Sequence, residues 1–197
     1  AGTECYVDTW YDQSGNGHHA VSTTNVKQPL IYSASAVITS NGKPLIQSLN
    51  GVTGTSDSHM DTNLNTTSSM FMDVFTVQQI PSLGGQNVTI GKRGSWAGYF
   101  GRANQDGSNI KFGNGSLYRG STSLLNSLDM YNATISQSLI YMDIQHSVNN
   151  LTFGQWYGTV EMASMQECII WQTGISSVGN DNRTAIETNI NSYFNIY

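Results

Sequence analysis

The chain has 197 residues, of which 38% are hydrophobic and only 11% are charged, and its formal net charge is −5. Its length suits one all-β domain with a buried core, so we expect a single domain spanning residues 1–197. The basic residues do not cluster beyond Lys92-Arg93, which argues against nucleic acid as a partner, and no apolar run reaches the roughly 18 residues needed for membrane insertion.

Polar uncharged residues take the place of ions on this surface, because Gly, Ser, Thr and Asn are abundant. Such compositions are common outside cells. We therefore expect a secreted protein or one displayed on an outer surface, including the exterior of a virion.

Residues 10–20 place two aromatic side chains directly before a loop rich in turn formers. Asp, Ser and Asn side chains bond neighbouring backbone groups, and Gly adopts positive φ angles, so the segment predicts a strand that ends in a tight loop. Asp12, Ser14 and Asn16 also match the first half of a calcium loop, but Thr23 stands where the bidentate Glu is expected. We expect these side chains to brace the turn and no cofactor to be needed, with Ca²⁺ as the alternative.

Alternating apolar residues over 71–78 predict a central strand that is buried on both faces. Short apolar runs at residues 88–91 and 96–101, a turn, and a returning strand at 109–112 predict a meander. Residues 139–145 and 151–153 predict another hairpin.

The C-terminal part predicts one strong strand and one helix. The strand covers residues 168–171, and the helix covers 181–194, with Asn180 or Asp181 as its N-cap. Its apolar face consists of Ile186, Ile190, Tyr193 and Phe194. Many short strands and a short C-terminal helix favour an all-β fold of the jelly-roll β-sandwich type.

Cys5 and Cys168 are the two cysteines, and they lie near the first and penultimate predicted elements. Terminal strands are often neighbours in a two-sheet fold, so we expect a Cys5–Cys168 disulfide that contributes about 4 kcal/mol in the chain-entropy model. The alternative is two unpaired thiols.

Acceptor triplets for N-glycosylation predict an extracellular glycoprotein. They begin at Asn65, Asn87, Asn114, Asn132, Asn150 and Asn182. A chain so rich in Asn, Ser and Thr contains about four such triplets by chance, so their number alone does not indicate modification.

Several segments share the pattern of one domain family. They are residues 10–20, 28–32, 41–46, 49–51, 75–77 and 166–171 with the helix that follows. Together they resemble the concanavalin-A-like, laminin-G-like lectin and glucanase modules, which implies a lectin-like jelly roll. Similar modules carry several strands before the first of these segments, whereas nine residues precede Trp10 here. This difference predicts an open sheet edge, and with it a shortened sandwich or strand exchange with a neighbouring chain.

Sugar binding requires aromatic faces together with amides and carboxylates. Two candidate clusters meet this requirement; the first contains Trp96, Tyr99, Arg102, Asn104 and Asp106, and the second contains Trp156 and Tyr157. The alternative is that aromatic residues, including Trp10, Tyr99 and Trp171, fill the core.

Catalytic chemistry has little support in the sequence. On an unbroken strand the acids Glu161 and Glu167 would lie about 20 Å apart, too far for one glycosidic bond. The His residues lack zinc-site spacing. We expect no catalytic residues, and a lectin-like module whose partners are glycans or further copies of itself in a fibre, capsid decoration or adhesin. The alternative function is a glycoside hydrolase acting on a plant or algal polysaccharide.

Overall fold

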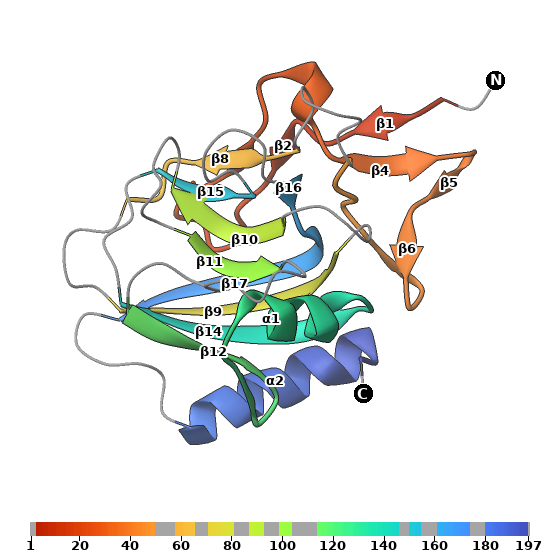
Figure 1. Ribbon diagram of the computed structural model, residues 1–197. Coiled ribbons are helices and arrows are strands. Elements are labelled where there is room, and N and C mark those ends of the chain that lie inside the picture. Colours follow the sequence, from red (N-terminus) through yellow and green to blue (C-terminus); the bar gives the residue numbers. More distant parts are fainter. Residues whose placement is uncertain are drawn as a thin grey trace.

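Two stacked β-sheets and a C-terminal helix form the body of the molecule (Figure 1). The computed structural model describes residues 3–49, 58–65, 71–80, 87–92, 99–103, 114–145, 150–154, 161–173 and 180–196. Most of its elements are strands in antiparallel sheets, which confirms the predicted all-β class at this level.

The larger sheet has the strand order β11-β10-β15-β8-β3-β2, and β16 pairs in parallel with β10. In chain order its strands are β2 (Thr9–Trp10), β3 (Ala20–Val21), β8 (Met60–Thr62), β10 (Asn87–Lys92), β11 (Tyr99–Ala103), β15 (Leu151–Phe153) and β16 (Glu161–Met162). The strand β2 lies at one edge of this sheet.

The second sheet has the order β13-β12-β14-β9-β17 and is antiparallel throughout. Its strands are β9 (Phe71–Gln79), β12 (Asn114–Arg119), β13 (Thr122–Leu124), β14 (Ser138–Gln145) and β17 (Ser164–Thr173). The strand β17 lies at one edge, next to β9.

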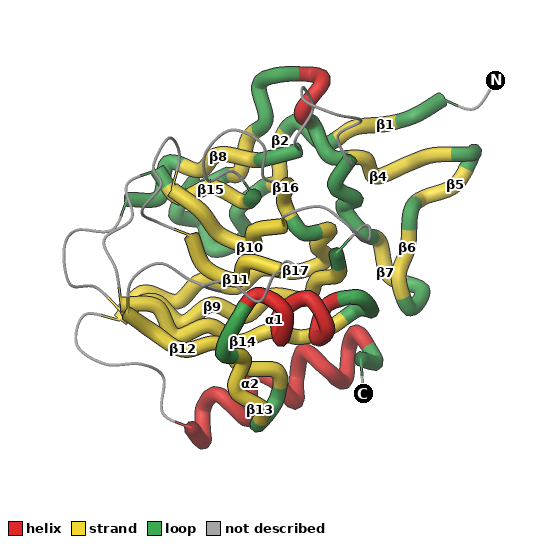
Figure 2. The backbone as a smooth tube through the Cα atoms, viewed as in Figure 1, coloured by secondary structure: helices red, strands yellow, loops and turns green. Residues whose placement is uncertain are grey.

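Two small sheets lie beside the stacked pair (Figure 2). One consists of β1 (Cys5–Tyr6), β4 (Leu30–Ser33) and β5 (Ala36–Val37), and the other of β6 (Thr39–Ser40) and β7 (Lys43–Pro44). A single 3-10 turn, η1 (Asn25–Lys27), precedes β4. Asn41 and Gly42 connect β6 to β7 with φ angles of 47° and 72°, the consecutive positive values of a type I′ hairpin turn.

The strand β9 is buried on both of its faces. Met72 and Val74 belong to the main core cluster, which also contains Ile90 of the larger sheet, so this core lies between the two sheets. Phe75 and Val77 point to the other face and belong to a second cluster. The predicted central strand is therefore confirmed.

The helix α2 (Asn180–Phe194) covers that second face, with Ile190 and Phe194 packed in the cluster. It begins at Asn180, one residue before the predicted range. Tyr193 departs from the predicted apolar face, because it is 61% exposed and lies beneath the Lys43 ammonium. One turn from the N-terminus, the Arg183 guanidinium carbon lies 4.4 Å from the ring centroids of Tyr118 and Tyr141.

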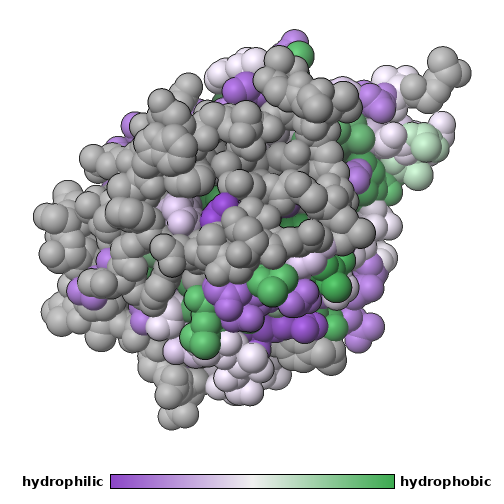
Figure 3. Space-filling model, viewed as in Figure 1, coloured by the Kyte–Doolittle hydropathy of each residue, from purple (hydrophilic) through white to green (hydrophobic). Residues whose placement is uncertain are grey.

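A helix that the sequence pattern did not predict, α1 (Ser127–Thr134), contributes Met130 and Tyr131 to the main core. Asn126 caps it, since its side chain accepts bonds from two backbone amides and Asp129 bonds back to the cap residue. Its solvent side leaves Leu128 exposed, and Figure 3 shows hydrophobic side chains among polar ones on this face of the molecule.

The predicted hairpin between residues 139–145 and 151–153 is wrong. β14 lies in the five-stranded sheet between β12 and β9, whereas β15 lies in the larger sheet between β10 and β8. The chain therefore changes sheets between the two runs. In the predicted meander, β10 and β11 do pair in antiparallel fashion, but β12 belongs to the other sheet, and residues 104–113 lie outside the described part.

The predicted disulfide is also wrong, because Cys5 and Cys168 are both free. Its premise was that the first and penultimate strands are neighbours. In the structure β1 pairs with β4 in a small peripheral sheet, and β17 pairs with β9.

Two glycines with positive φ provide a test of the packing between β15 and β16. A Cβ atom on Gly154 (φ 94°) would lie 2.5 Å from the Met162 backbone nitrogen, whereas one on Gly120 (φ 55°) would meet nothing within 4 Å. We expect Gly120→Ala to lower the free energy of unfolding by about 1–2 kcal/mol through backbone strain alone. Gly154→Ala adds an overpacking cost of about 1–3 kcal/mol. Urea denaturation measures both, and equal losses would contradict the contact.

Candidate functional site

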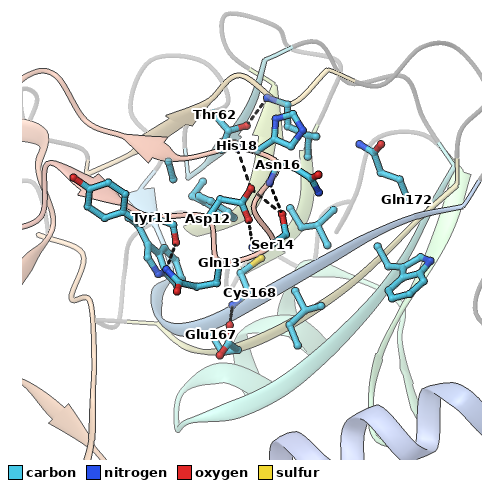
Figure 4. A pocket seen from close by; sticks show the side chains of 17 residues that line it. Tyr11, Asp12, Gln13, Ser14, Asn16, His18, Thr62, Glu167, Cys168 and Gln172 are labelled. Atoms are coloured by element: carbon cyan, nitrogen blue, oxygen red, sulfur yellow. Dashed lines mark hydrogen bonds between the residues drawn. The ribbon is translucent and has the colours of Figure 1, made fainter.

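A pocket of about 570 Å³ opens where the edges of the two main sheets meet. One wall is the loop after β2, residues 11–18, and the opposite wall is β17 from Glu167 to Gln172 (Figure 4). Because β2 and β17 are both edge strands, the pocket occupies the open side of the stacked pair.

The loop wall is held by the carboxylate of Asp12. Its Oδ1 accepts a bond from the Ser14 backbone N–H at 2.8 Å, and its Oδ2 accepts bonds from Ser14 Oγ at 2.9 Å and the His18 backbone N–H at 3.0 Å. These bonds to Ser14 and His18 lower the pKa of Asp12 to about 2. Gly15 and Gly17 have φ angles of 83° and 76°, as the turn requires.

Further contacts attach this loop to the larger sheet. Asn63, which directly follows β8, meets the His18 ring with its Oδ1 2.8 Å from Nδ1. His19 accepts a bond from the Asp12 backbone N–H at 3.0 Å, and the Tyr11 ring packs edge-on against it. Hydrogen bonds therefore fix the loop at Asp12 and at His18.

The strand wall presents alternate side chains to the two faces of its sheet. Cys168 and Ile170 pack against the main core, and Gln172, two residues further along the strand, has its side chain on the same face. Glu167 lies opposite Val77, a residue of the cluster beneath α2, so its side chain belongs to the other face. Burial raises the pKa of Glu167, and a bond from the Cys168 backbone N–H partly opposes the increase.

The floor of the pocket is apolar. Ala20, Leu64 and Phe153 line it and are all buried members of the main core. Trp10 packs on Phe153 with ring centroids 5.8 Å apart. The mouth is polar and aromatic, because Gln13, Asn16 and Gln172 lie around it together with the exposed ring of Tyr11.

The two acids among the described residues that line this pocket, Asp12 and Glu167, lie in different surroundings. Asp12 has both oxygens engaged in the loop, and Glu167 lies on the opposite face of β17. A retaining glycosidase needs two carboxyl groups about 5 Å apart on either side of one bond. Glu161 of the predicted pair belongs to β16 of the other sheet.

The hydrogen bonds around Asp12 match the predicted bracing of the turn. Ser14 Oγ also accepts a bond from the Asn16 backbone N–H at 3.2 Å, so the oxygens offered for calcium bond within the loop. Among the described residues, no group of three or more His, Cys, Asp or Glu side chains is placed to hold a metal ion.

Of the predicted sugar-binding residues, the structure describes Tyr99 and Arg102, and neither lines this pocket. Tyr99 and Arg102 are 6% and 7% exposed on β11, so the fold leaves little of either side chain for a ligand to touch. Five further predicted residues, Trp96, Asn104, Asp106, Trp156 and Tyr157, lie outside the described part of the chain.

The predicted glycosylation sites differ in accessibility. Asn65, Asn132, Asn150 and Asn182 are exposed. Asn87 is 2% exposed within β10, so the folded chain does not offer it for modification. The side chain of Asn114 lies outside the description.

Sequence reasoning missed two exposed aromatic rings, of which Tyr11 belongs to the loop wall and Trp171 to the outer face of β17, on the side of Glu167 and away from the core. Tyr11 is 63% exposed and Trp171 is 58% exposed, although the sequence suggested that Trp171 fills the core. The available signal for Trp171 was the strict alternation of β17, in which Cys168 and Ile170 take the core face.

Comparisons with protein-family models, curated proteins and solved structures found no match to this chain. Within the residues that the structure describes, no helix combines the length and apolarity needed to cross a membrane.

The two thiols give a first test of the site. Cys5 is exposed, whereas Cys168 is half-buried in the pocket wall, where burial and the Glu167 charge raise its pKa. We expect iodoacetamide to modify Cys5 first, because the thiolate is the reactive form. Peptide mass spectrometry measures both rates, and Cys5→Ser identifies the slower one. Equal rates, or a disulfide in the untreated protein, would contradict this description.

The brace at Asp12 predicts a pH dependence of the loop. Since the pKa of Asp12 falls from 3.8 to about 2, its contribution is fully present above pH 4 and is lost as the pH falls through about 2. We expect Asp12→Asn at neutral pH to speed amide exchange severalfold at Ser14 and His18, and acid to lower the protection factors of the same two amides in the native chain. Hydrogen exchange by NMR measures this, and Asp8→Asn, outside the pocket, is the control. Unchanged exchange in Asp12→Asn would exclude the brace.

Proposed function

We propose that this chain is a non-catalytic, surface-displayed lectin-like module that binds glycans in the pocket between β2 and β17. The supporting observation is one concave site that combines the exposed aromatic ring of Tyr11 with uncharged amides above an apolar floor.

Sugar rings carry apolar C–H faces and hydroxyl groups that both donate and accept hydrogen bonds. Aromatic side chains stack on the C–H faces, and amides such as Gln13, Asn16 and Gln172 bond the hydroxyls in both directions. A pocket volume of about 570 Å³ lies in the usual range for small-ligand sites. The site therefore suits one or a few sugar units.

The family resemblance of the sequence also supports the proposal. Two stacked sheets, antiparallel apart from the β10–β16 pair, enclose one core, and a helix follows β17, an arrangement that is compatible with a concanavalin-A-like jelly roll. We extend the proposal to that architecture and to secretion or display outside a cell or virion. The predominance of uncharged polar residues supports the latter.

Binding is favoured over hydrolysis by the positions of the acids. Asp12 braces its own loop, and Glu167 belongs to the other face of β17, so neither is set to act on a bond held between them. The pocket offers contact surface rather than a pair of carboxyl groups.

A glycan array with three variants tests the proposal. Tyr11→Ala and Gln172→Ala should each weaken retention by tenfold or more, about 1.4 kcal/mol or above, because the first removes a stacking surface and the second removes an amide that bonds sugar hydroxyls. Tyr193→Ala is the matched control, since Tyr193 is similarly exposed, at 61%, but lies on α2.

All three variants should keep the native melting temperature within a few degrees. An array on which the native chain retains no glycan would refute the function. Equal losses in all three variants would place binding elsewhere.

A further inference from the structure

We propose that the pocket selects sugars that carry an acetamido group over otherwise identical sugars that carry a hydroxyl there. This inference rests on the proposed glycan binding and names the ligand class. It follows from two features of the pocket: an apolar floor and an exposed row of peptide groups.

The floor is part of the main hydrophobic core. Ala20, Leu64 and Phe153 are 4%, 8% and 5% exposed, and Cys168 and Ile170 of β17 pack against the same cluster. A sugar that carries only hydroxyls has C–H faces on its ring but no apolar group that projects from it, and a hydroxyl buried at this floor without a partner is unfavourable. A methyl group is the natural complement.

The peptide groups come from the free side of β17. Met165 exchanges both of its backbone hydrogen bonds with Ile46, so it faces away from β9. Because pairs alternate along an antiparallel ladder, the register after the bulge turns Cys168, Ile170 and Gln172 away from β9 as well. The Cys168 N–H agrees with this assignment, since it bonds the Glu167 side chain at 3.2 Å.

The backbone of Ile170 and Gln172 therefore offers N–H and C=O groups to the pocket. Among the described residues, Ile46, opposite Met165, is the only one whose backbone pairs with β17 on this side. An acetamido group has the N–H and C=O of a peptide and ends in a methyl. It can bond the strand edge as a short strand does while its methyl enters the floor.

Other substituents satisfy one half of this requirement. The methyl of a 6-deoxy sugar fits the floor but brings no amide, and a free amino group brings donors but no apolar end. The pairing of both features therefore points to N-acetylhexosamines.

The decisive probes are N,N′,N″-triacetylchitotriose and cellotriose, which differ only in acetamido against hydroxyl at the three C2 positions. Isothermal titration calorimetry with the native chain should give an affinity for triacetylchitotriose at least about tenfold higher, because a site built to bond an amide rejects the analogue that lacks it. The deacetylated trimer should bind no better than cellotriose.

A variant and a protection experiment test whether the preference for acetamido groups arises in this pocket. Ala20→Val adds two methyl groups to the floor and should remove most of the preference while cellotriose binding persists. In the native chain, saturating triacetylchitotriose should slow iodoacetamide modification of Cys168 and leave Cys5 unchanged. The second experiment needs no substitution and stands if Ala20→Val folds poorly.

The possible results distinguish a failure of the acetamido assignment from a failure of the proposed glycan binding. Equal affinities for the two trimers, or a preference without protection of Cys168, would overturn the acetamido assignment and leave glycan binding in place. Binding of neither these trimers nor any glycan on the array would remove the proposed function itself. If a blocked hexapeptide of alternating valine and threonine binds more tightly than both trimers and protects Cys168, the edge takes peptides and the inference is wrong.

Discussion

Burial of β9 on both faces is the constraint that positions the rest of the molecule. One face closes the core between the two main sheets, and the other is covered by α2. A strand in this position needs a hydrogen-bonded neighbour on each side, since unpaired backbone groups in an apolar interior are costly. β14 and β17 supply those neighbours. The register of β17 on β9 then determines which of its side chains face the pocket.

Below α2, a hydrogen bond joins two buried polar groups of β9 and β14. The Tyr141 hydroxyl donates to Asp73 Oδ1 at 2.5 Å, and burial together with this bond raises the pKa of Tyr141. Arg183 lies over the Tyr141 ring and bonds Glu187 at 3.0 Å. The helix is thus fixed at one end by a cation and at the other by the buried Phe194. This anchoring holds the five-stranded sheet, and with it the strand wall of the pocket.

The sequence pattern was sufficient to predict β9 and α2, because in each element apolar residues recur at the spacing of its buried side chains. The pattern was insufficient to predict which strands pair with one another and therefore to which sheet a strand belongs. The runs in β14 and β15 have ordinary strand character, but local pattern does not reveal that the chain crosses from one sheet to the other between them. The same limit explains the failed disulfide, since Cys5 belongs to a peripheral sheet. The helix α1 did carry a local signal, Asn126 with Asp129 three residues later.

For the pocket, the turn formers of the first loop were recognised from the sequence, but their role as a wall was not. That role depends on β17, more than 140 residues later, lying across from Asp12 in space. The predicted sugar clusters failed at Tyr99 and Arg102 because local neighbours do not determine which side of β11 is covered.

An open strand edge invites unwanted pairing, and this chain limits the exposure of β17 in several ways. The bulge between Met165 and Glu167 breaks the register, Ile46 occupies one end, and the braced loop stands opposite the remainder. Since Asp12 holds that loop before any ligand arrives, ordering it adds no entropic cost to binding. The arrangement that protects the edge from a second chain is therefore the one that leaves a preformed space of about 570 Å³ beside its peptide groups.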